Sequence, residues 1–395
     1  MNDVSRDLID ARAARLLAAY RGADPFFFAT AEHTLLAQGC YAEVPPADNL
    51  ADLGLRVDEQ LQAARRKGHP NPVVVGAIPF DSRKPACLTI PRQVISAGPL
   101  GGRGGEGARR PGRYLVQPVP QPQDYAEAVG EAVRQIKAGK LSKVVLARTL
   151  ALAGEEPVDV QGLLGRLARH NAHGYTFAVR LPGSRPGTLL GASPELLISR
   201  RGLQVRSNPL AGSAARTADG AEDARRGQAL LASNKDLHEH QIVADAVAAG
   251  LRPHCRTLAV PAGPSLIHTA TMWHLSSDIR GELADAGIGT LRLAAGLHPT
   301  PAVCGHPSAA AFDLIGRLDA FDRGFYTGLV GWCDADGNGE WVVTLRCAEV
   351  QDNRMRLFAG AGIVADSDPQ GEVAETEAKF KTMLNALGHA PEGVC

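Results

Sequence analysis

The chain has 395 residues, 45% of them hydrophobic, and its 42 basic residues are balanced by 42 acidic ones. This composition favours a folded protein with a substantial core, and the zero net charge gives no general attraction to nucleic acid or to an anionic membrane surface. No apolar run approaches the length of a membrane-spanning helix, and the charged start of the chain does not resemble a secretion signal. We therefore expect a cytoplasmic protein that binds a small molecule, with no nucleic-acid or membrane partner.

The N-terminal part is predicted to combine a helix with short buried strands. Residues 1–20 show an amphipathic helical pattern, whereas residues 26–28 and 73–79 are apolar runs of strand length. Glycine and proline dominate residues 98–112, which indicates a solvated loop.

From residue 122 the pattern becomes more regular. Apolar residues at helical spacing run to residue 136, and an apolar strand is predicted over 143–148. Further elements are expected in the order strand 175–181, strand 188–199 and one long helix over 220–250.

The last third contains three strand-like segments, 325–333, 341–350 and 355–364, joined by short turns. This arrangement predicts a continuous antiparallel meander. An amphipathic helix is expected over 370–387. Because helices and strands do not alternate strictly, we predict an α+β fold and not a doubly wound parallel sheet.

Two predicted helices each carry a pair of carboxylates three residues apart, Asp236 with Glu239 and Glu372 with Glu375. At this spacing both members of a pair project from one face of the helix. Mg²⁺ prefers oxygen ligands and commonly takes one or two protein carboxylates together with water and substrate. Acidic residues at this spacing are also common on solvated helices, so the pairs alone do not establish a metal site.

Two further charged residues lie in apolar segments. Lys143 begins a predicted strand, and a lysine withdrawn from water favours its neutral form, which a general base requires. Glu195 is flanked by apolar residues, which raise the pKa of a carboxyl group and suit it to act as a general acid. Either residue is equally compatible with a simple charge at the end of a strand.

In nine ordered segments the chain resembles the chorismate-utilising enzymes, a family that includes isochorismate, salicylate, anthranilate and aminodeoxychorismate synthases. The segments are KVVLAR (143–148), GASPELL (191–197), PLAGS (209–213), KDLHEHQIV (235–243), MWHLSSDIRG (272–281), LHPTPAVCG (297–305), GFYTGLVGW (324–332), LRCAEV (345–350) and GAGIVADSDPQGEVAETEAK (360–379). The resemblance implies one large α+β domain over residues 1–395, in which two packed antiparallel β-sheets are flanked by helices. Within it, residues 1–115 would form an N-terminal sheet and helix portion, and residues 122–388 the chorismate-binding catalytic core.

The resemblance also implies a metal site. Glu239 and Glu375 would hold Mg²⁺, which would grip the ring carboxylate of chorismate, and Asp236 and Glu372 would support these ligands from behind. Lys379 would balance the negative charge.

The substrate site is implied in the same way. Tyr326 and Arg346 would bind the enolpyruvyl carboxylate, with Arg346 as a fork-shaped donor. The other residues that would line the substrate are Gly212, Ser213, His274, Gly360 and Gly362. For His274, a structural role as a hydrogen-bonded core histidine is an equally good interpretation.

Two positions narrow the choice within the family. Members that form aminodeoxychorismate carry a lysine that attacks the ring, and this chain has Ala211 at that position. Members that use ammonia carry a glutamine where this chain has Lys143. Water needs a base and ammonia does not, so Lys143 indicates that water is the nucleophile and that no glutaminase subunit is required.

The predicted activity is that of an isochorismate synthase. Lys143 would deprotonate water for attack at C2 of chorismate, and Glu195 would protonate the C4 hydroxyl group as it leaves. Residues 26–39 and 73–91 resemble the enzymes of catecholate siderophore pathways, so 2,3-dihydroxybenzoate is the expected downstream product. A salicylate synthase, which uses the same residues and then eliminates pyruvate, stays open as an alternative, and an ammonia-using lyase like anthranilate synthase is a weaker one. We expect a monomer.

Overall fold

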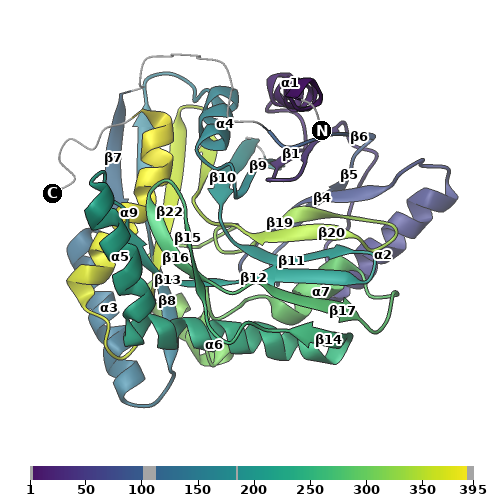
Figure 1. The fold of residues 1–395 in the computed structure, drawn as a ribbon. Helices are drawn as coiled ribbons and strands as arrows, with labels where there is room; N and C mark the ends of the chain where they lie inside the picture. The colour runs from purple at the N-terminus through teal and green to yellow at the C-terminus, as the bar shows by residue number, and fades with distance from the viewer. Residues whose placement is uncertain (1–2, 101–112, 184–185, 389–395) are drawn as a thin grey trace.

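Two large antiparallel sheets dominate the computed structural model, which describes residues 3–100, 113–183 and 186–388 (Figure 1). Sheet A has ten strands in the order β18-β8-β22-β21-β10-β9-β1-β2-β6, and β7 also pairs with β8. These strands are β1 (Phe26–Ala29), β2 (Thr34–Gln38), β6 (Gln93–Ala97), β7 (Tyr114–Val119), β8 (Lys143–Gly154), β9 (Tyr175–Leu181), β10 (Gly187–Ser193), β18 (Gly305–His306), β21 (Cys347–Gln351) and β22 (Arg354–Ile363).

Sheet B has nine strands in the order β14-β17-β12-β11-β20-β19-β4-β5-β3. These are β3 (Ala42–Glu43), β4 (Val73–Ile78), β5 (Cys87–Ile90), β11 (Leu196–Arg201), β12 (Gln204–Asn208), β14 (Cys255–Ala259), β17 (Ile279–Leu283), β19 (Leu329–Asp334) and β20 (Gly339–Val343). Figure 1 shows β8 and β22 of sheet A running across the direction of β11 and β20 of sheet B, as in orthogonally packed sheets.

A small third sheet, sheet C, has the order β13-β16-β15 and was not predicted. Its strands are β13 (Leu210–Ala215), β15 (Ser265–His268) and β16 (Met272–Ser276). All strand pairs in the described part of the chain are antiparallel. The predicted α+β class with two packed antiparallel sheets is confirmed.

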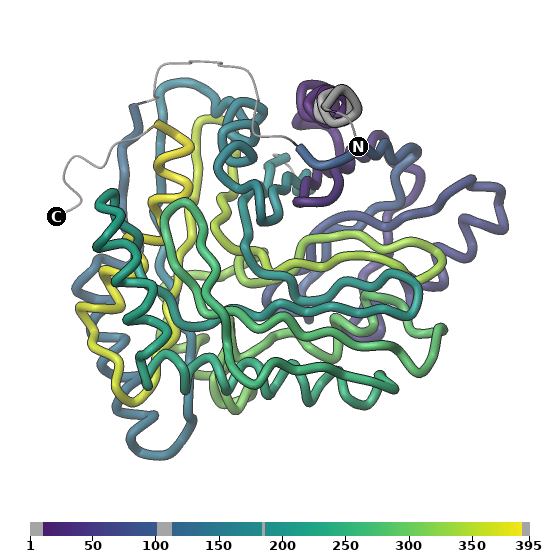
Figure 2. Tube along the Cα trace, viewed as in Figure 1, coloured from purple at the N-terminus to yellow at the C-terminus, as the bar shows by residue number. Residues whose placement is uncertain are grey.

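Helices cover the outer faces of both large sheets. The helices are α1 (Asp3–Ala19), α2 (Leu50–Arg66), α3 (Pro122–Lys137), α4 (Val160–Arg169), α5 (Gly220–Ala232), α6 (Asn234–Leu251), a 3₁₀ turn (Arg252–His254), α7 (Thr290–Leu297), α8 (Ser308–Leu318) and α9 (Pro369–Leu387). Helices α1, α4 and α9 pack on sheet A, whereas α2, α6 and α7 pack on sheet B. Figure 2 shows α9, near the end of the chain, lying beside α3, and the two helices are in contact.

The alternation of side chains along β1 explains how the layers are joined. Phe26 and Phe28 belong to the core between the two sheets, and Phe27 belongs to the core under α1, α4 and α9. Successive residues of a strand point to opposite faces, so one apolar triplet serves two cores. Burying each ring stabilises the fold by roughly 1.5–3 kcal/mol.

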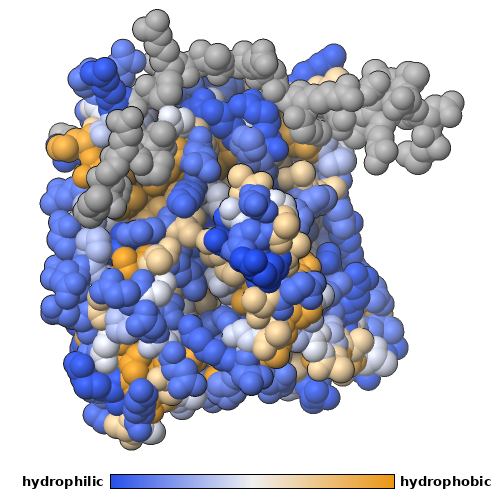
Figure 3. Space-filling model, turned by 60° about the vertical axis from the view of Figure 1, so that its left-hand side comes forward, coloured by the Kyte–Doolittle hydropathy of each residue, from blue (hydrophilic) through white to orange (hydrophobic). Residues whose placement is uncertain are grey.

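On the face that carries α3, α5 and α9, hydrophilic residues dominate and apolar patches are separate (Figure 3).

The meander predicted near the C-terminus is wrong. Strands β19 and β20 form a hairpin in sheet B, whereas β21 and β22 form one in sheet A. The chain crosses between the sheets just before β21, where Arg346 adopts a positive φ of 47°. All four strands are rich in buried residues, so the apolar pattern did not reveal the crossing. Its consequence is that Arg346 lies between the layers.

The single helix predicted over 220–250 is two helices, α5 and α6. The break falls at Ser233, whose backbone is extended and whose Oγ accepts a hydrogen bond from Asp236 N at 3.3 Å. Serine is a favourable residue at the start of a helix because it satisfies a free backbone N–H. Helical spacing on both sides of Ser233 concealed this break in the sequence.

Both predicted terminal helices are present as α1 and α9, although residues 1–2 lie outside the described residues. The same is true of residues 101–112 of the predicted glycine-rich loop. In the described ranges, none of the helices combines the length and the apolar character needed to cross a membrane.

Candidate active site

One cavity brings together residues from strands of sheets A and C, from connecting loops, and from helices α6 and α9. Most of the predicted site residues line it. They are Glu195, Gly212, Ser213, Glu239, His274, Tyr326, Arg346, Gly360, Gly362, Glu375 and Lys379. The three exceptions are Lys143, Asp236 and Glu372, which lie outside the cavity lining. Segments far apart in the sequence therefore meet at one place.

Lys143 lies against the wall of this cavity as the first residue of β8. Its side chain is fully buried, and its Nζ is 2.9 Å from Glu239 Oε1, although the two groups are not aligned as a hydrogen bond. A Cβ atom added at Gly362 would lie 2.1 Å from Glu239 Oε1 and 3.1 Å from Lys143 Cε. Only glycine at position 362 leaves room for this pair of charges.

Glu195 lies in the short connection between β10 and β11 and is 3% exposed. Ser193 Oγ accepts a hydrogen bond from Glu195 N at 3.2 Å and donates one to Val343 O at 2.6 Å, which fixes this connection to β20. Burial raises the pKa of Glu195 from 4.5 to about 7, and the hydrogen bond from Leu210 N and the nearby lysine and arginine charges oppose this only in part. The group is therefore able to hold or release a proton near neutral pH.

Glu375 faces the cavity from α9 and is held by two donors. Lys379 Nζ lies 2.5 Å from Glu375 Oε1, and Ser213 Oγ donates to the same oxygen at 3.0 Å. Burial raises the pKa of Glu375, but Lys379 and Ser213 together lower it below its ordinary value. Lys379 also donates to Gly360 O at 2.8 Å, so the ammonium group is fixed between helix and strand.

Helix α9 begins and ends at well-defined residues, which sets the position of Glu375. Asp368 accepts a hydrogen bond from Gly371 N at 2.7 Å at the N-terminus, and Gly388 ends the helix in the left-handed region. Both features are typical helix caps.

Glu239 is buried and Glu375 is half-buried, and each of these carboxylates lies beside a lysine on the wall of the same cavity. Within residues 3–100, 113–183 and 186–388 there is no group of three or more His, Cys, Asp or Glu side chains that could hold a metal ion. Two oxygen donors fit Mg²⁺, which usually takes one or two protein carboxylates and completes its octahedron with water and substrate. Zinc, which favours nitrogen and sulfur ligands, does not fit these residues.

The two outer carboxylates lie behind the cavity. Asp236 accepts a hydrogen bond from Ser233 Oγ at 2.5 Å, and burial raises the pKa of Asp236. Glu372 is 2% exposed and lies 2.9 Å from Lys235 Nζ. Burial and the neighbouring Glu375 raise the pKa of Glu372 to about 7. Lys235 was not predicted as part of the site, although it directly precedes Asp236 in the sequence.

Arg346 provides a donor that lacks a protein partner among the described residues. It is 6% exposed, and its Nε has no hydrogen-bond partner in the described part of the chain. His274 lies beside it, with Nε2 at 3.4 Å from Arg346 Nη2. Burial and the charges of Arg346 and Lys379 lower the pKa of His274 well below its ordinary value, so the ring is neutral and accepts at Nε2. An unpaired buried guanidinium donor is costly unless an anion occupies the cavity.

Tyr326 and its neighbour Thr327 form another part of the cavity wall. The Tyr326 ring stacks on Phe358 at 5.1 Å, and Thr327, like Arg346, has a positive φ, of 59°. A Cβ atom at Gly360 would lie 2.9 Å from the Tyr326 hydroxyl oxygen. Non-glycine residues with positive φ are uncommon and are often held at functional sites, and two of them line this cavity.

Several lining residues were not singled out in the sequence. They are Val145, Pro194, Leu210, Ala302, Val303, Thr327 and Leu345. Arg323 connects three of these segments, since it donates to Val145 O at 2.6 Å and to Val303 O at 2.8 Å and lies 3.4 Å from Thr327 Oγ1. Asp319 accepts from Arg323 Nε at 2.7 Å. The only signal for Arg323 in the sequence is its place directly before the segment GFYTGLVGW.

These features define an enzyme class. The cavity combines a carboxyl group poised near neutral pH, two carboxylates suited to a hard cation, and an arginine whose Nε has no partner in the described part of the chain. Such a site suits acid–base chemistry on a small anionic substrate.

The chain belongs to the chorismate binding enzyme family, whose model matches residues 108–388. It is 52% identical to the isochorismate synthase DhbC of Bacillus subtilis over 390 residues, covering 96% of this chain and 98% of the relative. It is 44% identical to the vibriobactin-specific isochorismate synthase of Vibrio cholerae over 386 residues, covering 98% of this chain and 95% of the relative. The crystal structure of a putative 2,3-dihydroxybenzoate-specific isochorismate synthase, DhbC, from Bacillus anthracis superimposes with a TM-score of 0.92 at 48% identity, covering 96% of this chain and all of that one. The predicted family is confirmed.

Proposed function

We propose that this protein is a Mg²⁺-dependent isochorismate synthase, a cytoplasmic enzyme that converts chorismate reversibly to isochorismate. Relatives that carry this name match nearly the whole chain. The observation that carries the choice of reaction is Glu195, which lines the cavity and whose pKa of about 7 suits proton transfer. The buried Lys143 lies close enough for its charge to act on Glu195.

Glu239 and Glu375 would hold Mg²⁺, with Asp236 and Glu372 as outer support. The fit rests on one buried and one half-buried carboxylate in the same cavity, each with a lysine as counter-ion. When bound, the ion supplies positive charge that neutralises and orients the ring carboxylate of chorismate. Lys379 keeps Glu375 ionised, as its contact at 2.5 Å indicates.

Arg346 and Tyr326 bind the enolpyruvyl carboxylate. Arg346 has an unpaired Nε, and a guanidinium group binds a carboxylate through parallel hydrogen bonds. His274 accepts from Arg346 and so directs the guanidinium plane. Gly212, Gly360 and Gly362 line the ring without side chains that would fill its space, and Ser213 adds only a hydroxymethyl group that donates to Glu375.

The chemistry consists of two proton transfers. Lys143 takes a proton from the water molecule whose oxygen bonds to C2, and Glu195 gives a proton to the C4 hydroxyl group, which leaves as water. One hydroxyl group is gained and one is lost, so substrate and product are isomers, and the roles reverse in the back reaction. Ala211 offers no nucleophile for a covalent route.

The product would supply 2,3-dihydroxybenzoate for a catecholate siderophore, as the names of two relatives suggest. We further propose that residues 1–115 form a supporting portion, that residues 122–388 form the catalytic core, and that the enzyme acts as a monomer without a glutaminase subunit.

Incubation with chorismate, with Mg²⁺ or with EDTA, tests the function. Mass spectrometry and chromatography should identify isochorismate, formed only with Mg²⁺ and without pyruvate. Pyruvate together with salicylate would instead identify a salicylate synthase, which the same residues would serve, and the absence of turnover would contradict both assignments.

A further inference from the structure

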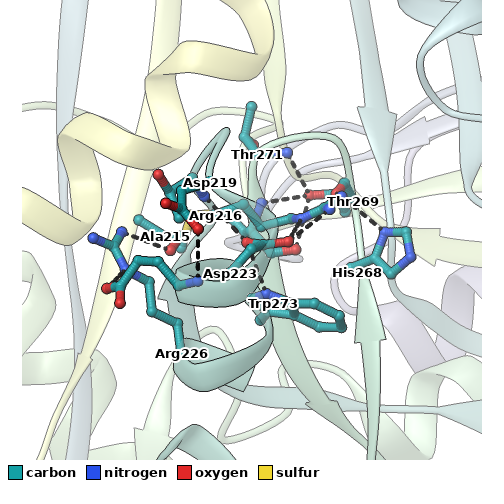
Figure 4. Close-up of polar contacts among 12 residues, drawn as sticks. Ala215, Arg216, Asp219, Asp223, Arg226, His268, Thr269, Thr271 and Trp273 are labelled. Carbon is teal, nitrogen blue, oxygen red and sulfur yellow. Dashed lines mark hydrogen bonds and ion pairs between the residues drawn. The ribbon is translucent and has the colours of Figure 1, made fainter. Parts of the chain in front are cut away.

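A dense polar cluster lies next to the cavity, on the helix α5 side of sheet C (Figure 4). At its centre is Asp223 of α5, which is 5% exposed. Its carboxylate accepts hydrogen bonds from Arg216 Nε at 3.0 Å, Arg216 Nη2 at 2.8 Å, Thr217 N at 3.1 Å and Trp273 Nε1 at 3.1 Å. The carboxylate is therefore fully engaged, and the hydrogen bonds from Arg216 are the main reason why its pKa falls to about 2.

Arg216 connects this carboxylate to the turn between β15 and β16. Its Nη1 donates to Thr269 O at 3.1 Å and lies 3.1 Å from His268 Nδ1, and its backbone N donates to Thr271 O at 2.9 Å. The guanidinium group also lies 5.3 Å above the centre of the Trp273 ring. One side chain thus joins the end of β13, helix α5 and the β15–β16 turn, as Figure 4 shows.

The same strands carry two cavity residues. In the β13–β16 pair, Ser213 lies opposite His274, and Ala214 lies opposite Trp273. Successive residues of a strand point to opposite faces, so when Trp273 faces the cluster, His274 faces the cavity. Helix α5 packs closely on this outer face, because a Cβ atom at Gly227 would lie 3.3 Å from the Trp273 ring.

Sheet C follows directly from β12 and leads into β17 of sheet B along the chain, and its side chains contact residues of the cavity. In the described part of the chain its three strands pair with one another and with no strand of sheets A and B. Ser213 Oγ reaches Glu375 at 3.0 Å, and His274 Nε2 lies 3.4 Å from Arg346 Nη2. Both contacts depend on the angle at which sheet C sits, and the polar cluster fixes the strand pair to α5 and to the turn.

We propose that Arg216, Asp223 and Trp273 position Ser213 and His274, and through them Glu375 and Arg346, for the reaction. Trp273 and Asp223 do not line the cavity, and neither does Arg216, so all three are positioning residues. The proposal rests on the proposed isochorismate synthase activity.

Two variants disturb the cluster with little change in size. Asp223→Asn removes the charge that Arg216 binds, and Arg216→Lys keeps a positive charge but loses the two-pronged geometry. Trp273→Phe removes the hydrogen bond to Asp223 and reduces the ring surface under Arg216. The matched control is Asp219→Ala in the same helix, because Asp219 caps α5 by accepting from Ala221 N at 2.9 Å and Glu222 N at 3.0 Å and does not contact the carboxylate of Asp223.

Each full-length variant is assayed for kcat, for the KM of chorismate and for the Mg²⁺ concentration that gives half-maximal rate, and thermal unfolding records its stability. Chorismate binding is also measured by calorimetry in EDTA, which requires no turnover. For Asp223→Asn and Arg216→Lys, the KM and the dissociation constant of chorismate should rise by roughly 10- to 100-fold, because small displacements of binding groups have effects of this size. The half-saturating Mg²⁺ concentration should rise with them, and Trp273→Phe should give a smaller rise.

A purely structural role predicts a different result. Asp219→Ala should lower the unfolding temperature and leave KM unchanged, since loss of folded protein reduces only the apparent kcat. If the cluster variants behave in the same way, with wild-type KM and chorismate affinity, the proposal is overturned. Should Asp223→Asn fail to fold, Arg216→Lys and Trp273→Phe decide the question. Wild-type protein that does not convert chorismate would refute the proposed function itself, which separates the two failures.

Discussion

Replacing Glu195 with glutamine should separate the catalytic role of this carboxyl group from its effect on stability. Glu195 is 3% exposed, and burial raises its pKa from 4.5 to about 7. Glutamine has nearly the same size but cannot give a proton to the leaving hydroxyl group. We expect kcat to fall by roughly 10²- to 10⁴-fold, the usual effect of losing a general acid.

The same change should stabilise the protein at alkaline pH. Because the pKa of Glu195 is higher in the folded than in the unfolded protein, its ionisation opposes folding. The stability associated with its protonated form is fully present below about pH 4.5 and is lost as the pH rises through about 7. The difference between the ordinary pKa of 4.5 and the pKa of about 7 in the folded protein corresponds to about 3 kcal/mol of folding stability. The wild type loses this stability as the pH rises, and the glutamine variant does not.

Urea unfolding in EDTA, without substrate, measures this difference. The stability of Glu195→Gln relative to wild type should increase by about 2–3 kcal/mol between pH 5 and pH 9. Glu127→Gln, an exposed carboxylate on α3, serves as the control and should show no such trend. A pH-independent difference for Glu195→Gln would refute the raised pKa, and an unchanged kcat would refute the role as general acid.

Further substitutions test the other proposed roles, with rates measured as chorismate consumption. Lys143→Ala should lower kcat by roughly 10²- to 10⁴-fold because no base remains for water, and a near-normal rate would exclude that role. Glu239→Ala or Glu375→Ala should abolish Mg²⁺-stimulated turnover, whereas turnover that EDTA still inhibits would argue against these ligands. Arg346→Lys keeps the charge but loses the fork, so the KM of chorismate should rise by roughly 10- to 100-fold, and an unchanged KM would contradict carboxylate binding by Arg346.

The elements with long regular patterns were predictable, whereas helices α2, α4, α7 and α8 and the strands of sheet C were not. The single strand predicted over 188–199 is two strands, β10 in sheet A and β11 in sheet B. The apolar run that begins at Lys143 is β8, and the amphipathic pattern over 370–387 is α9. Which sheet a strand joins was not predictable, since periodicity reports burial and not pairing partners. Arg346 illustrates this point, because its positive φ sends the chain from sheet B to sheet A, and no pattern in the sequence marks a positive φ at an arginine.

The spacing of the acidic residues predicted that both members of each pair project from one face of their helix. In the structure only one member of each pair lines the cavity. Glu239 and Glu375 line the cavity, whereas Asp236 and Glu372 lie behind it. The rotation of α6 and α9 about their axes decides this, and it depends on packing against sheets that spacing does not describe. The roles of these residues came from resemblance to the family, not from spacing.

The polar cluster around Asp223 was not predictable from the sequence. Trp273 and Asp223 are 50 residues apart, and the aspartate stands in an ordinary charged stretch of α5. The contact exists only because β13 and β16 pair side by side under that helix. Long-range polar contacts of this kind require the fold before they become visible.

Turnover of chorismate in ¹⁸O-labelled water tests the central claim most directly, because the proposed reaction takes the new hydroxyl group from solvent. Isochorismate isolated at low conversion should carry one ¹⁸O atom at C2, with a mass increase of about 2 Da, and the label should require Lys143 and Mg²⁺. Isochorismate formed without label would show that the hydroxyl group moves within the substrate, and would contradict the role of water and of Lys143.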